Sequence, residues 1–173
     1  AAARRWADVT STDYVPALLE RGQARAAAEG MQVKFREADA ENLPFDDASF
    51  DTVLSTFGVM FTPNQDRAAA ELLRVCKPRG KIGLANWTPA GFIGQVFKTL
   101  GKYLPPPAGA KSPALWGTRA RLTEMFDGEA RSASVLGLAP AARVMRVPPC
   151  GLQDWPSARA RAASRWREPA ARI

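Results

Sequence analysis

The fold is decided by two stretches of sequence, DAENLPFDDASFD at residues 39–51 and AAAELLRVCKPRGKIGLANWTP at residues 68–89. The first is an acidic loop that leads into an apolar strand running from Phe50 to about Phe57. The second holds most of a helix, a turn and another apolar strand. A strand, a helix and a further strand in this order are typical of a βαβ unit in a parallel sheet.

The helix and the strand of the second stretch have well-marked boundaries. A helix is predicted over Gln65–Lys77, because its apolar residues follow the i, i+3, i+4, i+7 spacing of one helix face. Pro78 and Gly80 end this helix, since proline lacks the N–H group that a helix interior needs. The apolar residues that follow predict a strand over Lys81–Trp87. The residues that form the helix face are Ala69, Leu72, Leu73 and Cys76.

The same alternation of strands and helices continues on both sides of these stretches. Upstream, we expect strands over Val9–Thr12 and Val33–Ala38, joined by a helix over Pro16–Glu29. Downstream, we expect helices over Ala90–Leu104 and Thr118–Phe126. The predicted fold class is therefore α/β, with a Rossmann-like parallel sheet and flanking helices.

The composition excludes several classes of function. The 173 residues include no histidine, which removes the most common general base and zinc ligand at neutral pH, so no metal site is predicted. Cys76 and Cys150 stand in no metal-ligand or redox spacing, and they indicate a reducing, cytoplasmic location. No apolar run approaches the ~18 residues of a membrane span. No secretory leader is visible.

The charge divides the chain at about residue 128. The net charge of +7 is made up of +2 from residues 1–128 and +5 from residues 129–173. We therefore expect a nearly neutral partial domain over 1–128, followed by an Ala-, Arg- and Pro-rich tail in which only Arg143–Val147 looks like a strand. Three interpretations of this tail remain open: a basic helical tail, a disordered arm, and the one that we favour, an out-of-frame reading of GC-rich coding sequence.

Acidic side chains follow two of the predicted strands, at the sheet edge where α/β folds bind their ligands. Asp13 ends the first strand, and its two carboxylate oxygens match the two vicinal hydroxyls of a ribose. Asp39 follows the next strand, where its carboxylate suits an adenine amino group while the N–H of Ala40 suits a ring nitrogen. The alternatives are a helix N-cap for Asp13 and a solvated acidic loop for residues 39–45.

The strand that begins at Phe50 delivers a third group of residues to the same edge. Ser55 and Thr56 end this strand, and apolar aromatic residues follow. These aromatics favour a hydrophobic small-molecule substrate, with core packing as the alternative interpretation. The residues of this apolar cluster are Phe57, Met60, Phe61, Trp87, Phe92 and Trp116.

Taken together and in this order, the motifs resemble those of class I S-adenosylmethionine-dependent methyltransferases, and among them the type 11 group that is similar to ubiquinone and menaquinone biosynthesis enzymes. The resemblance covers roughly residues 1–128. It implies a sheet of order 3-2-1-4-5-7-6, a methyl-transferring enzyme, S-adenosylmethionine as cofactor and a small-molecule acceptor. Ser55 and Phe57 match positions near the methionine arm and the methyl group.

The resemblance also assigns the nucleoside contacts. It places Asp13 on the ribose hydroxyls, with Tyr14 and Val15 beside the adenine. Asp39 and Ala40 match positions that recognise the adenine edge. No residue is predicted to be catalytic, because the sulfonium charge already activates the methyl group and the protein mainly aligns the reacting atoms.

Two features depart from the family pattern. Arg79 stands where the first glycine of a Pro-Gly-Gly turn is usual, a mild change at a surface turn. The family's glycine-rich DxGxGxG loop and the strand before it have no counterpart, so we expect an N-terminally truncated domain. Its first two strands would have no hydrogen-bonded connection to those at Phe50 and Lys81. Such a chain is expected to fold and to bind cofactor poorly, because the open strand edges carry unpaired backbone groups.

Other classes of protein fit the sequence less well. A nicotinamide-dependent oxidoreductase commonly needs Tyr-x-x-x-Lys, and neither Tyr14 nor Tyr103 has a lysine four residues on. A nucleic-acid-binding module lacks aromatic interleaving in its basic tail. A non-catalytic remnant is the third alternative. The tail arginines available for phosphate contacts are Arg159, Arg161, Arg165, Arg167 and Arg172.

Overall fold

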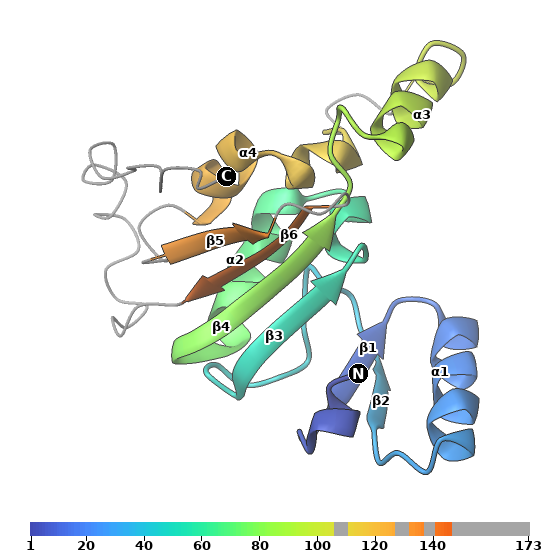
Figure 1. Ribbon diagram of the computed structural model, residues 1–173, viewed down its shortest axis with the longest axis vertical. Helices are drawn as coiled ribbons and strands as arrows, with labels where there is room; N and C mark the ends of the chain where they lie inside the picture. The colour runs from blue at the N-terminus through green and yellow to red at the C-terminus, as the bar shows by residue number, and fades with distance from the viewer. Residues whose placement is uncertain (106–110, 127–131, 137–140, 147–173) are drawn as a thin grey trace, which may run out of the picture.

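The computed structural model of the chain (Figure 1) describes residues 1–105, 111–126, 132–136 and 141–146, and it has the predicted α/β architecture. The strands are β1 (Thr10–Asp13), β2 (Lys34–Glu37), β3 (Phe50–Thr56), β4 (Cys76–Asn86), β5 (Ser132–Leu136) and β6 (Ala141–Arg146). The α-helices are α1 (Pro16–Ala28), α2 (Gln65–Val75), α3 (Phe92–Leu100) and α4 (Arg119–Phe126). Short 3-10 helices are η1 (Ala3–Arg5), η2 (Val59–Phe61) and η3 (Pro113–Gly117).

The strands form two separate sheets. β1 pairs with β2 in parallel, while a second sheet has the order β3-β4-β6-β5, in which β3 and β4 are parallel. β6 runs antiparallel to both β4 and β5. These orders correspond to the 3-2 and 4-5-7-6 parts of the sheet that the family resemblance implies. Within the described residues no strand joins β1 to β3, so the predicted lack of a hydrogen-bonded connection is confirmed.

The junction between α2 and β4 differs from the prediction. The helix ends at Val75 and the strand begins at Cys76, whereas the sequence pattern predicts a helix to Lys77 and a strand from Lys81. Two physical reasons account for the difference. A proline at position 78 disfavours helical backbone at the residue before it. In addition, Cys76 pairs with Phe50 ahead of a register shift in the ladder, which extends the strand backwards.

The remaining differences lie at element ends and in the C-terminal strands. α3 begins at Phe92 rather than Ala90, because Thr88 closes a turn by accepting the Gly91 N–H at both its carbonyl and its hydroxyl oxygen. α4 begins after Thr118, whose hydroxyl accepts the Arg121 N–H as an N-cap. β5 was not predicted as a strand. The arginines named above and Cys150 lie outside the described residues.

The hydrophobic core lies where α2, η3 and α4 pack against β4. Met60, Ile82 and Trp116 are fully buried there. Cys76 belongs to the same cluster, and burial raises the pKa of its thiol to about 11. The cysteine is therefore a small buried apolar residue, as its place on the predicted helix face indicated.

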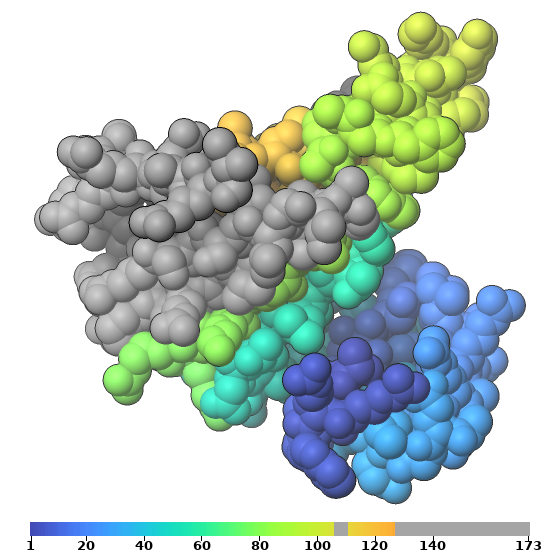
Figure 2. Space-filling model, viewed as in Figure 1, coloured from blue at the N-terminus to red at the C-terminus, as the bar shows by residue number. Residues whose placement is uncertain are grey.

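The β1–α1–β2 unit is packed much more lightly. Leu19 is the only buried apolar side chain that the structure shows in residues 1–37. Figure 1 shows α1 against the two-stranded sheet, and Figure 2 shows this blue unit beside the larger body that carries β3 and β4. Exposed ion pairs add little stability to it, such as Lys34 with Asp8.

Candidate functional site

A cleft of about 900 Å³ lies between the two sheets. Its walls come from the end of β1, the loop that follows β2, and β3 with the residues just after it. Both sheets contribute the carboxyl ends of parallel strands, which is where α/β folds bind their ligands. The structure brings all seven residues predicted to surround the cofactor to this cleft: Asp13, Tyr14, Val15, Asp39, Ala40, Ser55 and Phe57.

The two aspartates are held in the same way. One oxygen of Asp13 accepts the backbone N–H of Val15 at 2.9 Å, and one oxygen of Asp39 accepts that of Glu41 at 2.8 Å. Each is the hydrogen bond of an Asx turn, which fixes a carboxylate by using the chain two residues on. Among the described residues this is the single hydrogen bond that each carboxylate accepts, so the second oxygen remains available to a ligand.

The chemistry of this donor and acceptor set fits a nucleoside. Carboxylate oxygens accept hydrogen bonds from ribose hydroxyls and from an amino group, and the adjoining apolar wall can receive the faces of a base. Leu18, Phe45 and Val53 contribute to that wall. Tyr14 and Val15 are exposed, so they stand at its rim rather than inside it.

Ser55 and Phe57 have local structural tasks as well. The Ser55 hydroxyl oxygen accepts the Val59 N–H at 3.2 Å and so begins η2. Phe57 has a φ of 64°, in the left-handed region, and its N–H donates to the Ala85 carbonyl. Such backbone costs about 1–3 kcal/mol in a residue with a side chain and is found preferentially at functional sites.

The apolar cluster predicted from the sequence is divided in the structure. Phe57 stacks on Trp87 at 4.6 Å between ring centroids, and Phe61 meets the edge of Trp87 at 6.0 Å. Phe97 of α3 contacts both Phe61 and Trp87, at 6.2 and 6.1 Å. The sequence placed Phe97 on the apolar stripe of the predicted helix over Ala90–Leu104 but not in this cluster.

The other members of that cluster lie elsewhere. Met60 and Trp116 are fully buried in the core, so the alternative of core packing is correct for them. Phe92 lies on the outer surface of α3. Phe57 and Phe61 remain as the aromatic residues of the cluster that line the cleft.

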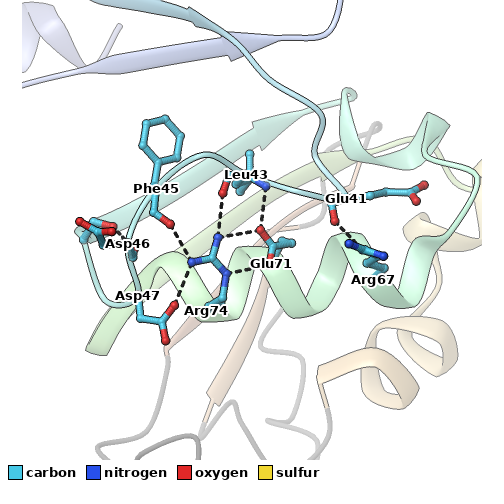
Figure 3. A network of polar contacts seen from close by, with 9 residues as sticks. Glu41, Leu43, Phe45, Asp46, Asp47, Arg67, Glu71 and Arg74 are labelled. Atoms are coloured by element: carbon cyan, nitrogen blue, oxygen red, sulfur yellow. Dashed lines mark hydrogen bonds and ion pairs between the residues drawn. The ribbon is translucent and has the colours of Figure 1, made fainter.

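A polar network fixes the acidic loop to α2 (Figure 3). The guanidinium of Arg74 donates to the carbonyl oxygens of Leu43 and Phe45, at 2.8 and 2.7 Å, and to the carboxylate of Asp47 at 2.8 Å. It also pairs with Glu71, which itself accepts the Leu43 N–H at 2.7 Å. One arginine therefore holds three points of a loop that has little regular secondary structure.

The electrostatics of this network follow from its hydrogen bonds. Those from Arg74 hold the pKa of Glu71 below its ordinary value, against the effect of partial burial. Hydrogen bonds to Glu71 and then to Asp47 raise the pKa of Arg74. Arg67 adds a second anchor, because its Nε donates to the carbonyl of Glu41 at 2.7 Å (Figure 3).

Sequence reasoning missed this network for an understandable reason. Glu71 and Arg74 stand three residues apart on a helix, which predicts an ordinary surface ion pair. The carbonyl groups of Leu43 and Phe45 carry no sequence signature. The acidic loop and the helix residues 71–74 belong to the two stretches that decide the fold, but the contact between them is seen only in the structure.

The fold is Rossmann-like, and its cleft lies at the carboxyl ends of parallel strands. Residues 1–84 match the family model described as "Methyltransferase domain". An uncharacterized protein of Mycobacterium tuberculosis is 50% identical over 126 residues, which are 72% of this chain and 46% of that protein. Another from the same organism is 45% identical over 148 residues, or 84% of this chain and 52% of that protein, so the likeness extends past residue 128.

A relative of known name is the demethylmenaquinone methyltransferase of Thermus thermophilus, 32% identical over 123 residues, which are 70% of this chain and 56% of that protein. A methyltransferase structure from Methanosarcina mazei has a TM-score of 0.64 at 17% identity and covers 85% of each chain. One from Thermotoga maritima has a TM-score of 0.61 at 18% identity, covering 80% of this chain and 72% of that one.

Residues 1–84 therefore carry a methyltransferase domain, and the named relatives and the fold support the resemblance to class I S-adenosylmethionine-dependent methyltransferases that the sequence motifs predicted. S-adenosylmethionine is the cofactor of this class. The chain spans about half the length of the curated relatives that it matches.

Proposed function

We propose that the protein of which this chain forms part binds S-adenosylmethionine in the cleft and transfers its methyl group to a small apolar acceptor. The observation that supports this most strongly is that the seven residues assigned to the cofactor from sequence, which come from three separate segments, all line one cleft. Asp13 would hold the ribose hydroxyls, and Asp39 with Ala40 would hold the adenine edge.

The residues of the chain would contribute binding and alignment. When bound, S-adenosylmethionine supplies a methyl group that is already activated by a sulfonium charge. Phe57 and Phe61 would shield the reacting end of the cleft from water and orient a flat acceptor, so the rate gain would come mainly from positioning. A named relative acts on demethylmenaquinone, and an apolar acceptor of that kind suits the aromatic cluster.

The affinity of the chain alone is expected to be low. The cleft has the edge strands β1 and β3 on its two sides, and within the described residues neither edge has a strand partner across it. A cleft that must be held open between two sheets binds less tightly than a preorganised one.

Calorimetric titration of S-adenosylhomocysteine into the 173-residue chain tests the cofactor site. Asp13→Asn should weaken binding by about tenfold to a hundredfold, because it removes a charged acceptor while asparagine still forms the Asx turn. Asp46→Asn is the matched control, since Asp46 is an exposed acid that does not line the cleft. Equal losses in both variants, or no loss in either, would contradict the assignment of Asp13.

The acceptor class is tested by following transfer of labelled methyl groups into products that partition into organic solvent. An apolar quinol should be methylated in preference to a small polar amine. Phe61→Ser should lower acceptor use without changing S-adenosylhomocysteine affinity. Trp6→Ser serves as the control, because Trp6 is an exposed aromatic outside the cleft. Preference for the amine would remove the apolar-acceptor part of the proposal.

A further inference from the structure

The helix α3 and the turn that follows it carry large apolar side chains that are exposed rather than packed in the core. Phe92, Tyr103 and Leu104 are 81%, 79% and 75% exposed. Leu100 is half exposed. Figure 2 shows this yellow-green segment projecting from the body of the molecule. We call the exposed surface formed by Phe92, Leu100, Tyr103 and Leu104 the α3 face.

The α3 face is separate from the side of the helix that packs on the fold. Phe97 points to the aromatic cluster, and Gly94 lies so close to the Thr88 and Pro89 carbonyls that a side chain there would clash. With about 100° per residue, Phe92 lies about 140° around the helix from Phe97 and about 160° from Gly94, so its exposed ring is on the side away from that contact. Leu100 is at the end of the helix, next to the turn that carries Tyr103 and Leu104.

The chain segment that carries the α3 face has only positive charges. No Asp or Glu occurs from residue 72 to residue 123. Lys98 and Lys102 flank the exposed apolar residues and are in none of the ion pairs that the described residues form. Lysines next to exposed aromatic and aliphatic side chains are the pattern of a helix that lies in the plane of a membrane interface.

We propose that the α3 face docks on an anionic lipid surface. The apolar side chains would enter the boundary between headgroups and acyl chains, and Lys98 and Lys102 would remain at the level of the phosphates. The contact is peripheral, since none of the described helices is long and apolar enough to cross a membrane.

Charge decides between this occupant and two others. The segment 129–173 carries a net charge of +5, so the lysines of the α3 face repel it. A second copy of the chain would bring the same lysines together across a two-fold contact. An anionic bilayer offers an apolar layer and a complementary charge at once.

Co-sedimentation of the whole chain with lipid vesicles tests the proposal. The chain should pellet with vesicles of phosphatidylcholine and phosphatidylserine, and much less with phosphatidylcholine alone. Raised salt should weaken its binding to the anionic vesicles. Phe92→Ser/Tyr103→Ser should lower the partition coefficient at least about tenfold. Lys98→Gln/Lys102→Gln should lower it about fivefold for each lysine, or about 25-fold together.

Matched controls separate this face from the rest of the chain. Trp6→Ser removes an exposed aromatic, and Arg5→Gln/Arg21→Gln removes two exposed cations, all on the N-terminal side of the molecule. Both controls should bind vesicles like the wild-type chain. Circular dichroism should show the same fold in every variant, because each substituted residue is exposed.

Three results would overturn the proposal. Equal losses in the controls and in the α3 variants would mean that no particular face is used. Unchanged binding in the α3 variants would assign the lipid contact to the Arg-rich segment 129–173. A chain that ignores vesicles but forms a dimer, which Phe92→Ser/Tyr103→Ser dissociates, would assign the face to a second copy. None of these results depends on cofactor binding.

Discussion

The two sides of the cleft are built very differently. The body that carries β3 and β4 has a continuous core, with Ile82 and Trp116 fully buried. The β1–α1–β2 unit has a single buried apolar side chain in residues 1–37, that of Leu19. Both sides follow the expected βαβ pattern, so correct local patterning does not guarantee a well-packed unit.

This difference separates the two aspartates that the proposed cofactor site needs. Asp13 ends β1 and depends on the lightly packed unit. Asp39 begins a loop that Arg74 and Glu71 fix to the well-packed body. A nucleoside bound by both carboxylates would therefore connect the lightly packed unit to the well-packed body. We expect the first to open locally at a lower free energy than the second.

The largest expected loss of stability comes from a substitution in the core of the well-packed body. Ile82→Ala should lower the free energy of unfolding by about 3–4 kcal/mol, since it opens a cavity in the core. Leu19→Ala should lower it by about 1 kcal/mol or less, because the unit that contains it opens separately. Urea unfolding followed by circular dichroism measures both. Equal losses would show that the two sides form one cooperative unit.

The positions of the elements were largely predictable from sequence, but the packing difference was not. The spacing of Ala69, Leu72 and Leu73 marked α2 and its buried face, and that face is buried in the structure. The α1 segment has similar apolar content in its alanines, yet only Leu19 finds a partner surface. Periodicity reports which face a helix offers, whereas burial depends on whether the rest of the chain covers it.

The candidate site shows the same limit. Strand-end acids such as Asp13 and Asp39 stand out in a sequence because parallel strands place their carboxyl ends at one edge. The anchor of the loop does not stand out, since Arg74 binds main-chain carbonyls, which every residue possesses. Residues that bind a ligand through their side chains can thus be predicted from sequence. Residues that hydrogen-bond to main-chain groups can be identified only in the structure.

The second prediction concerns the anchor of the loop that begins at Asp39. Arg74→Ala should cost about 2 kcal/mol of stability and should weaken S-adenosylhomocysteine binding, because it releases two loop carbonyls and leaves Glu71 partly buried without its partner. Arg67→Ala is the matched control, as Arg67 makes a single bond to the same loop. Hydrogen exchange of residues 40–47 should speed up in the first variant and hardly change in the second. Equal exchange in both would show that Arg74 is not the main anchor.

The third prediction uses pH on the same network. Hydrogen bonds from Arg74 lower the pKa of Glu71 in the folded chain below its ordinary value of 4.5. A lowered pKa contributes stability that is present above the ordinary value and is lost as the pH falls through the folded value. Glu71→Gln should therefore reduce the acid-side slope of the free energy of unfolding below about pH 4.5 and leave its slope near neutral pH unchanged. An identical acid-side slope in both chains would contradict this role.

A small gain in stability is expected from relieving a strained backbone position in the well-packed body. Arg79 has a φ of 67° at the irregularity near the start of β4, at the position where the family pattern has glycine. Left-handed backbone costs a residue with a side chain about 1–2 kcal/mol, and glycine returns part of that gain through its freer unfolded state. Arg79→Gly should therefore raise the free energy of unfolding by about 0.5–1 kcal/mol, measured by urea unfolding.

The lightly packed unit provides the reciprocal test. Gly30 follows α1 with a φ of 63°, and an added Cβ there would meet no atom within 4 Å, so Gly30→Ala changes backbone strain alone. It should destabilise the β1–α1–β2 unit by about 1 kcal/mol, which hydrogen exchange of α1 amides would detect. Global unfolding should respond to Arg79→Gly and hardly to Gly30→Ala, because Arg79 belongs to the well-packed body and Gly30 does not. A global response to Gly30→Ala as large as that to Arg79→Gly would mean that the two sides of the cleft unfold together.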